Sequence, residues 1–156
     1  MQERQVDIAI IGAGVVGLAT ALSLAPTGLQ IALFDAQPKP SVGAQGKALN
    51  DWDRRVTALT PESIRFLKSL DAWPSIEQTK RGGAYTDMFV WDSEGTGHVH
   101  FTAADLNMQS LGTIVESSLT TQALISATEA VPNVSIHWGT RLESMDIEAE
   151  GVRFTT

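Results

Sequence analysis

Residues 6–17 of this 156-residue chain run VDIAIIGAGVVG, a short apolar segment that leads directly into three spaced glycines. The β-branched run at 6–11 predicts a strand that is covered on both faces. Residues 18–25 are apolar or small nearly all round and predict a buried helix, ended by a proline and a glycine at 26–28. Residues 31–34 predict a second buried strand, which ends at Asp35. Together these segments predict a βαβ unit, in which a helix joins two parallel strands.

The glycine turn between the first strand and the helix has a pattern suited to a diphosphate. Gly12 permits the tight turn, Gly14 lets a diphosphate approach the main chain, and Gly17 allows the helix to pack closely on the strand. The start of the helix then offers unpaired N–H groups and a positive dipole end to the anion. The candidate cofactor contacts in this turn are Gly12, Ala13, Gly14, Val16 and Gly17.

Asp35, at the end of the second strand, has the spacing of a carboxylate that binds a ribose diol. Its charge disfavours a 2′-phosphate, so NADP is not expected at this turn. FAD and NAD share the same adenosine diphosphate half, and the turn therefore does not distinguish them. The other alternative is a tight turn that binds no ligand. It is less favoured, because the strand, the glycines, the helix, the second strand and the acid all occur in the order of a nucleotide-binding unit.

Composition and charge exclude several other classes of protein. The chain has no cysteine, which excludes disulfides, thiolate zinc sites and a cysteine nucleophile. A formal net charge of −7 argues against a broad nucleic-acid-binding face. His98 and His100 would share one face of a strand, but without a clear third ligand we predict no metal site. The sequence shows no secretory signal and no apolar run that could span a bilayer, so we expect a cytoplasmic protein.

The rest of the chain predicts further helices and strands around a β-rich insertion. Residues 36–53 are a long polar connection, and the triplet at 60–62, Thr-Pro-Glu, predicts the start of a helix. Residues 88–91 and 98–101 flank a glycine-containing loop and predict a β-hairpin. The remaining predicted elements are a long amphipathic helix at 114–130, a third strand at 134–138, and two final segments at 142–148 and 152–155.

Residues 53–59, DRRVTAL, and the helix after them resemble a segment of the flavin-dependent aromatic hydroxylases, the p-hydroxybenzoate-hydroxylase-like superfamily. The resemblance is to the ubiquinone-biosynthesis branch, whose members hydroxylate polyprenylated phenols and quinols. A second partial match lies at 112–116, GTIVE, and the strand at 134–138 is also similar. Asp71 departs from the pattern, because the family has glycine there. The matching positions of the first segment are Asp53, Arg55, Ala58, Leu59, Ser63, Leu67, Leu70 and Trp73.

The resemblance implies FAD as cofactor, NAD(P)H and O2 as co-substrates, and hydroxylation of an aromatic, polyprenylated substrate. It implies Arg55 as a guanidinium donor to the diphosphate or ribitol region of FAD. Val56 and Ala58 would provide a small apolar surface beside the flavin ring. Glu116, expected near the start of a helix, would contact the ribityl hydroxyls. No catalytic side chain is expected in this stretch of sequence.

Two of these residues also suit ordinary structural roles. Without the resemblance, a salt bridge from Arg55 to Asp51 or Asp53 is the favoured interpretation. Glu116 equally suits an acid that stabilises the first turn of a helix.

We therefore predict an α/β fold with a Rossmann-like, FAD-binding parallel sheet. Residues 1–81 would hold the βαβ unit and the following helix, 82–110 part of a β-rich substrate region, and 111–156 the return to the FAD-binding domain. None of the 13 glycines adjoins an aspartate, whereas the family closes its flavin site with Asp-Gly and Gly-Asp motifs. We therefore expect an amino-terminal part of a longer hydroxylase, inactive by itself. Exposed strand edges would favour self-association, and a polyprenyl substrate would favour peripheral contact with a membrane.

Two other functions remain open from the sequence. One is an FAD-dependent oxidase or dehydrogenase that shares only the cofactor turn. The other is a non-catalytic nucleotide-binding or assembly module.

Overall fold

A computed structural model of the chain describes residues 5–41 and 52–156. The chain divides into two compact units. Unit 1 takes in Met1–Lys47 and Thr121–Thr156, and unit 2 takes in Ala48–Thr120. The predicted division into segments 1–81, 82–110 and 111–156 rests on the family resemblance rather than on compactness, and it stays a prediction.

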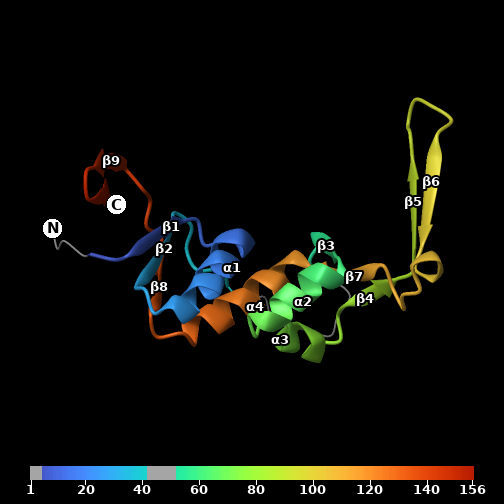
Figure 1. Cartoon of the computed structure of the whole chain (residues 1–156), viewed down its shortest axis with the longest axis horizontal. Helices are drawn as coiled ribbons and strands as arrows, with labels where there is room; N and C mark the ends of the chain where they lie inside the picture. The colour runs from blue at the N-terminus through green and yellow to red at the C-terminus, as the bar shows by residue number, and fades with distance from the viewer. Residues whose placement is uncertain (1–4, 42–51) are drawn as a thin grey trace. The chain divides into compact units, whose positions relative to one another are not determined.

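Unit 1 is built on a parallel sheet of three strands in the order β1–β2–β8 (Figure 1). β1 spans Ile8–Ile11, β2 spans Ile31–Asp35 and β8 spans Val134–Trp138. Helix α1, Val15–Leu24, joins β1 to β2 and contacts both strands. The register pairs Ile11 with Phe34 and Asp35 with Trp138, so the carboxyl ends of the strands lie at one edge of the sheet. The predicted βαβ unit and third strand are confirmed.

Aliphatic side chains from three elements form the core of unit 1. The apolar sequences of α1 and β2 place their side chains there, together with the second half of helix α4, Ser117–Glu129. After α1 a short 3-10 turn, Ala25–Thr27, ends at Gly28 with a left-handed φ of +78°. The largest fully buried aliphatic side chains of this core are Leu18, Ile31, Leu33, Leu124 and Ile125.

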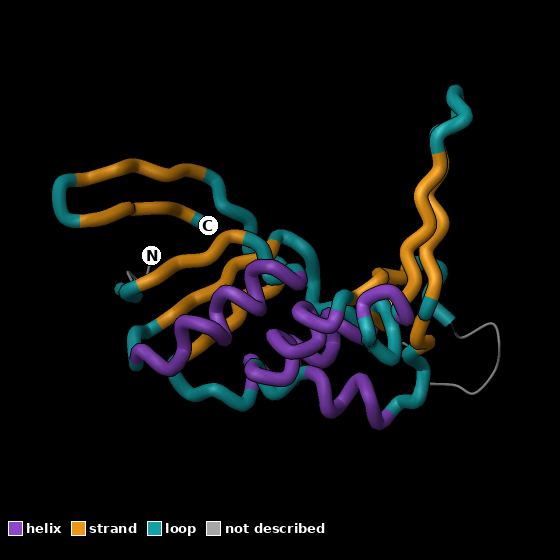
Figure 2. The backbone as a smooth tube through the Cα atoms, turned by 45° about the vertical axis from the view of Figure 1, so that its right-hand side comes forward, coloured by secondary structure: helices purple, strands orange, loops and turns teal. Residues whose placement is uncertain are grey.

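The last two strands of unit 1 form a separate antiparallel hairpin (Figure 2). β9 spans Ser144–Glu148, within the segment predicted at 142–148. β10 spans Gly151–Thr155 and begins one residue before the segment predicted at 152–155. Phe154 meets Phe34 of β2 edge-to-face, with ring centroids 5.1 Å apart.

Unit 2 contains an antiparallel sheet in the order β3–β7–β4. β3 spans Val56–Leu59, β7 spans Gly112–Glu116 and β4 spans Gly83–Tyr85. Helix α2, Pro61–Ser69, follows β3 and is capped by Thr60, whose hydroxyl accepts the Ser63 N–H at 3.2 Å. This confirms the helix start predicted from residues 60–62. Helix α3, Trp73–Gln78, contacts α2.

The helix predicted at residues 114–130 is wrong in its first turn. Residues up to Glu116 form β7, and α4 begins only at Ser117. Thr113, Ile114 and Val115 are β-branched, and β7 is hydrogen-bonded on both sides, to β3 and to β4. Pairing on both edges outweighs the helical spacing of the apolar residues.

Asp71, where the family has glycine, has a left-handed φ of +55°. It follows α2, and its N–H bonds the Lys68 carbonyl at 3.1 Å. A left-handed residue after a helix is the conformation that favours glycine, and aspartate tolerates it better than most side chains. The left-handed turn after α2 therefore forms with aspartate at this position.

The predicted hairpin at 88–101 is confirmed and is open to solvent. β5, Asp87–Trp91, pairs with β6, His98–Thr102, and the short 3-10 turn Ala104–Leu106 follows. Phe89 of this hairpin stacks on His100 with ring centroids 4.0 Å apart.

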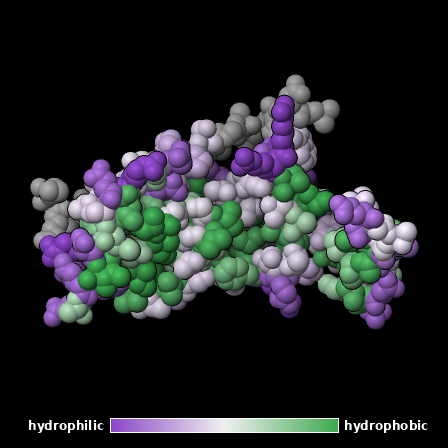
Figure 3. Space-filling view, turned by 90° about the horizontal axis from the view of Figure 1, so that it is seen from above, coloured by the Kyte–Doolittle hydropathy of each residue, from purple (hydrophilic) through white to green (hydrophobic). Residues whose placement is uncertain are grey.

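Figure 3 shows apolar side chains at the surface in patches between hydrophilic ones. Within the described ranges, no helix has both the length and the apolar character needed to cross a membrane.

Candidate functional site

The glycine turn of unit 1 is a tight, hydrogen-bonded connection between β1 and α1. Gly12 has a φ of +102°, a conformation that side chains rarely adopt. Its N–H bonds the carbonyl of Phe34 at 2.8 Å, which ties the turn to the end of β2. The left-handed φ of Gly12 therefore explains why the tight turn requires glycine at this position.

Gly14 and Gly17 differ in what surrounds them. A Cβ at Gly17 would lie 1.9 Å from the carbonyl oxygen of Gly12, so only glycine lets α1 approach the turn this closely. A Cβ at Gly14 would meet no atom within 4 Å. The main chain at Gly14 thus faces open space, as the approach of a diphosphate requires.

Helix α1 begins at this open space with its first N–H groups available. Gly14 is the N-cap residue, no described side chain caps the helix, and its first turn contains no acidic residue. An anion is favoured at such a helix start by the unpaired N–H groups and by the dipole. Of the other predicted contacts, Val16 is 79% exposed and Ala13 is 3% exposed.

Asp35 lies at the carboxyl end of β2 and is bonded to the same turn. One carboxylate oxygen accepts the Ala13 N–H at 2.8 Å and the other accepts the Gln37 N–H at 2.8 Å. Each oxygen keeps a second lone pair, so the carboxylate can still accept hydrogen bonds from a ribose diol. The structure therefore brings the acid and the glycine turn together, as the sequence predicts.

Arg55 belongs to unit 2, in the short loop that precedes β3. Its side chain is exposed, and in the part of the chain that the structure describes its guanidinium forms no salt bridge. Its main chain is held firmly, because its N–H bonds the Asp53 carboxylate at 2.9 Å and its carbonyl accepts the Ser117 N–H at 3.0 Å. The salt bridge to Asp53 considered from the sequence is replaced by a main-chain hydrogen bond, and Asp51 lies outside the described residues.

Asp53 organises this loop and the start of α4. Its carboxylate accepts the Arg55 N–H, and its second oxygen accepts the Ser118 N–H at 3.2 Å, 65 residues along the chain. The Arg55 N–H lowers the pKa of Asp53 below its usual value of 3.8, and the Ser118 N–H acts in the same direction. Val56 and Ala58, two residues apart on β3, are both exposed and available to a ligand.

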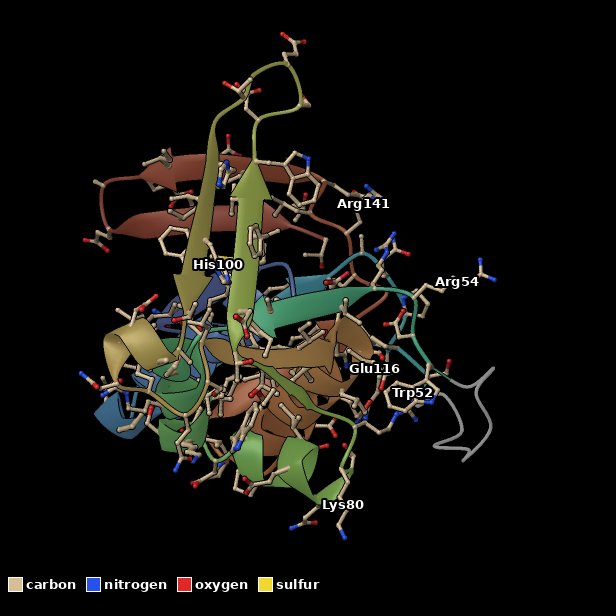
Figure 4. All side chains as sticks on the ribbon, turned by 90° about the vertical axis from the view of Figure 1, so that its right-hand side faces the viewer. Trp52, Arg54, Lys80, His100, Glu116 and Arg141 are labelled. Atoms are coloured by element: carbon tan, nitrogen blue, oxygen red, sulfur yellow. The ribbon has the colours of Figure 1, made fainter. Side chains whose placement is uncertain are left out.

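Glu116 is the last residue of β7 rather than a member of a helix, and its carboxylate is only 3% exposed. It faces Arg81, with Nη2 to Oε1 at 2.7 Å and Nε to Oε2 at 2.7 Å. Its Oε1 also accepts the Asp53 N–H at 2.5 Å. Figure 4 shows Glu116 and Trp52 close together in unit 2.

The sequence-based predictions included neither Arg81 nor Trp52 among the site residues. Trp52 is 47% exposed, and its ring lies 4.5 Å from the Arg81 guanidinium carbon, which is cation–π geometry. No spacing along the chain signals these contacts, which join residues 52, 81 and 116.

A family model described as FAD dependent oxidoreductase matches residues 7–87, just over half of the chain. This chain belongs to the family of FAD-dependent oxidoreductases. The match contains the glycine turn, Asp35 and Arg55. The prediction of FAD as the cofactor is confirmed at the level of the family.

Curated relatives of this FAD-dependent oxidoreductase chain include enzymes of ubiquinone biosynthesis. It is 37% identical over 137 residues to the 3-demethoxyubiquinol 3-hydroxylase of Escherichia coli, with 87% of this chain and 33% of that protein covered. It is 28% identical over 160 residues to the ubiquinone biosynthesis monooxygenase COQ6 of Dictyostelium discoideum, with 96% of this chain and 32% of that protein covered. The chain thus spans about a third of the length of these relatives.

A solved structure confirms the fold. The p-nitrophenol 4-monooxygenase PnpA of Pseudomonas putida superposes with a TM-score of 0.66 at 18% identity, over 99% of this chain and 39% of that one. The similarity supports the predicted Rossmann-like α/β arrangement of this FAD-dependent oxidoreductase.

Proposed function

We propose that this protein is an FAD-dependent monooxygenase that hydroxylates an aromatic ring with NAD(P)H and O2. The substrate class we propose is a polyprenylated phenol or quinol of ubiquinone biosynthesis, because the relatives named above act in that process. The observation that carries the proposal is the open space at Gly14, bordered by the start of α1 and by Asp35. Bound FAD would supply the redox chemistry with O2, which side chains alone lack.

The residues of this chain would bind and orient the cofactor. The turn formed by Gly12, Ala13, Gly14, Val16 and Gly17 would receive the diphosphate, and Asp35 would accept hydrogen bonds from the ribose. Arg55, with an exposed guanidinium on a fixed main chain, would add a cation for the diphosphate or ribitol region. Val56 and Ala58 would offer a small apolar surface to the flavin ring.

Two interactions of the protein with larger partners belong to the same proposal. A polyprenyl substrate resides in a membrane, so we expect peripheral contact of the protein with a membrane surface. The outer edge of β1 pairs with no other described strand, and such an edge can pair with a second copy.

Titration of the 156-residue chain with FAD and with ADP tests the cofactor site. Both ligands should bind, and Gly14→Val should abolish binding of both, because its side chain fills the space at the turn. Arg55→Met should weaken FAD binding roughly tenfold, the loss of one charge-assisted contact. Arg54→Met is the matched control, since it removes the same charge from the neighbouring exposed position and should have a smaller effect. Binding of neither ligand would contradict the proposal.

Product analysis of the enzyme isolated from its own cells tests the reaction. NAD(P)H-dependent transfer of an isotopically labelled oxygen atom from O2 into a polyprenylated phenol is the expected result. Oxidation of a substrate without oxygen insertion would favour an oxidase or dehydrogenase instead.

A further inference from the structure

Unit 2 contains a buried ion pair that the proposed cofactor contacts do not use. Arg81 and Glu116 are 12% and 3% exposed, and the guanidinium meets the carboxylate with two nitrogen–oxygen distances of 2.7 Å. Trp52 lies over the guanidinium at 4.5 Å. The guanidinium of Arg81 is therefore held between an aromatic ring and a carboxylate.

The pair is linked by hydrogen bonds to the loop before β3. Glu116 accepts the Asp53 N–H at 2.5 Å, and Asp53 in turn accepts the N–H of Arg55 at 2.9 Å. The loop is also fastened to the start of α4, through the Ser118 N–H to Asp53 and the Ser117 N–H to the Arg55 carbonyl. A short chain of contacts thus runs from Arg81 through Glu116 and Asp53 to the main chain of Arg55.

Stability alone is a weak reason for such a pair. Taking two charges out of water is costly, and apolar side chains of similar volume are often as stabilising as a buried ion pair. A geometric role explains the pair better, because apolar side chains could not accept the Asp53 N–H. The residue at the end of the chain of contacts, Arg55, has a fixed main chain and an exposed side chain.

We propose that Arg81 and Glu116 are positioning residues that hold the 52–55 loop so that Arg55 is presented to the cofactor. The inference rests on the proposed function for the role of Arg55. In this proposal the positioning role takes the place of the ribityl contact that the resemblance implies for Glu116, because its carboxylate is 3% exposed and already bound by Arg81 and the Asp53 N–H. Glu116 acts through the Asp53 N–H, and Arg81 orients Glu116.

Two double variants separate positioning from stability. Arg81→Met with Glu116→Gln removes both charges and keeps a side-chain oxygen that can accept the Asp53 N–H. Arg81→Met with Glu116→Leu removes both charges and the acceptor. Neither variant leaves an unpaired buried charge, which is the main source of instability when one partner is removed. The measurements are thermal unfolding, amide hydrogen exchange at Asp53, and FAD affinity of the 156-residue chain.

The variant with leucine should exchange the Asp53 amide roughly tenfold faster than the variant with glutamine, since local opening is no longer opposed by that hydrogen bond. Its FAD affinity should fall roughly tenfold, by the loss of one charge-assisted contact. Adding Arg55→Met should lower affinity further only in the glutamine variant, because Arg55 is already displaced in the leucine variant. Equal exchange and equal affinity in the two double variants would overturn the proposal.

The failure of the proposed function has a different signature. If the wild-type chain binds no FAD, the cofactor proposal fails, and the Asp53 exchange comparison still decides whether the pair holds the loop. Should the leucine variant not fold, Arg81→Lys takes its place, because lysine keeps the charge but lacks the planar fork of donors. Faster Asp53 exchange and weaker FAD binding are then expected, and wild-type values of both would overturn the proposal.

Discussion

Gly17→Ala is the substitution whose effect the structure predicts most directly. The new Cβ would lie 1.9 Å from the Gly12 carbonyl oxygen and 3.1 Å from its carbonyl carbon. Both atoms belong to the main chain of the turn, so no side-chain rotation relieves the contact. Either α1 or the turn must move by about 1 Å, since side-chain carbons rarely approach other atoms within 3.0 Å.

The expected cost is a balance of two effects. In an exposed helix, replacing glycine by alanine stabilises by roughly 1 kcal/mol through helix propensity. Adding a methyl group to a tightly packed site costs about 1–3 kcal/mol, and more when backbone must shift. With this contact at 1.9 Å the packing cost prevails, and we expect a net loss of about 2 kcal/mol, or roughly 4–8 °C in Tm for a chain of this size.

Gly14→Ala is the matched control for this prediction. Its Cβ meets nothing within 4 Å and its φ of −77° suits alanine, so its stability cost should stay below about 1 kcal/mol, the scale of an N-cap change. Thermal unfolding followed by far-UV circular dichroism measures both variants, and titration with FAD shows whether the alanine at 14 blocks the diphosphate. The reasoning is refuted if Gly17→Ala unfolds at or above the wild-type temperature, or if Gly14→Ala leaves FAD affinity unchanged.

Four further outcomes are expected. Thr60→Ala should lower the urea midpoint by an amount equivalent to about 1 kcal/mol, through loss of the α2 cap. Asn133→Ala should cost about 1–3 kcal/mol, because its amide donates to two main-chain carbonyls at 3.0 and 2.8 Å, and aspartate at 133 should not restore the loss. The Arg55 N–H lowers the pKa of Asp53 in the folded protein, so the unfolded chain binds the proton more tightly. The wild-type chain should therefore have a larger free energy of unfolding than the Asp53→Asn variant, with the full difference above the usual pKa of 3.8. The difference should shrink as the pH falls below that value, which acid unfolding curves of the two proteins measure. A nucleotide with a 2′-phosphate should compete with FAD at least roughly tenfold more weakly than ADP because of the Asp35 charge, and Asp35→Asn should narrow the difference.

The elements that the sequence predicted correctly depend on local signals. The βαβ unit combines a β-branched run, spaced glycines and a terminal acid within residues 6–35, and each part constrains its neighbours. The cap at Thr60 and the hairpin around residues 93–97 are local in the same way. These local preferences are kept in the folded protein because the tertiary contacts favour the same structure.

The errors and omissions involve contacts between distant parts of the chain. Residues 112–116 form a strand because β3 and β4 pair with both of their edges, and those partners lie 25 or more residues away in sequence. The first turn of α4 is bonded to Asp53, whose carboxylate accepts the Ser118 N–H across 65 residues, and no local sequence pattern predicts this contact. Arg81 was missed for the same reason, since its partner Glu116 lies 35 residues away.

The hydrogen bond from the Ala13 N–H to Asp35 bears on any attempt to redesign cofactor preference. Replacing Asp35 with a small neutral residue would remove the repulsion of a 2′-phosphate. The same replacement would leave the Ala13 N–H without its acceptor, in a residue that is only 3% exposed. An unsatisfied donor of this kind costs about 1–3 kcal/mol. A variant designed to accept a 2′-phosphorylated nucleotide therefore needs a new hydrogen-bond acceptor for the Ala13 N–H. The choice of nucleotide and the structure of the turn must be changed together.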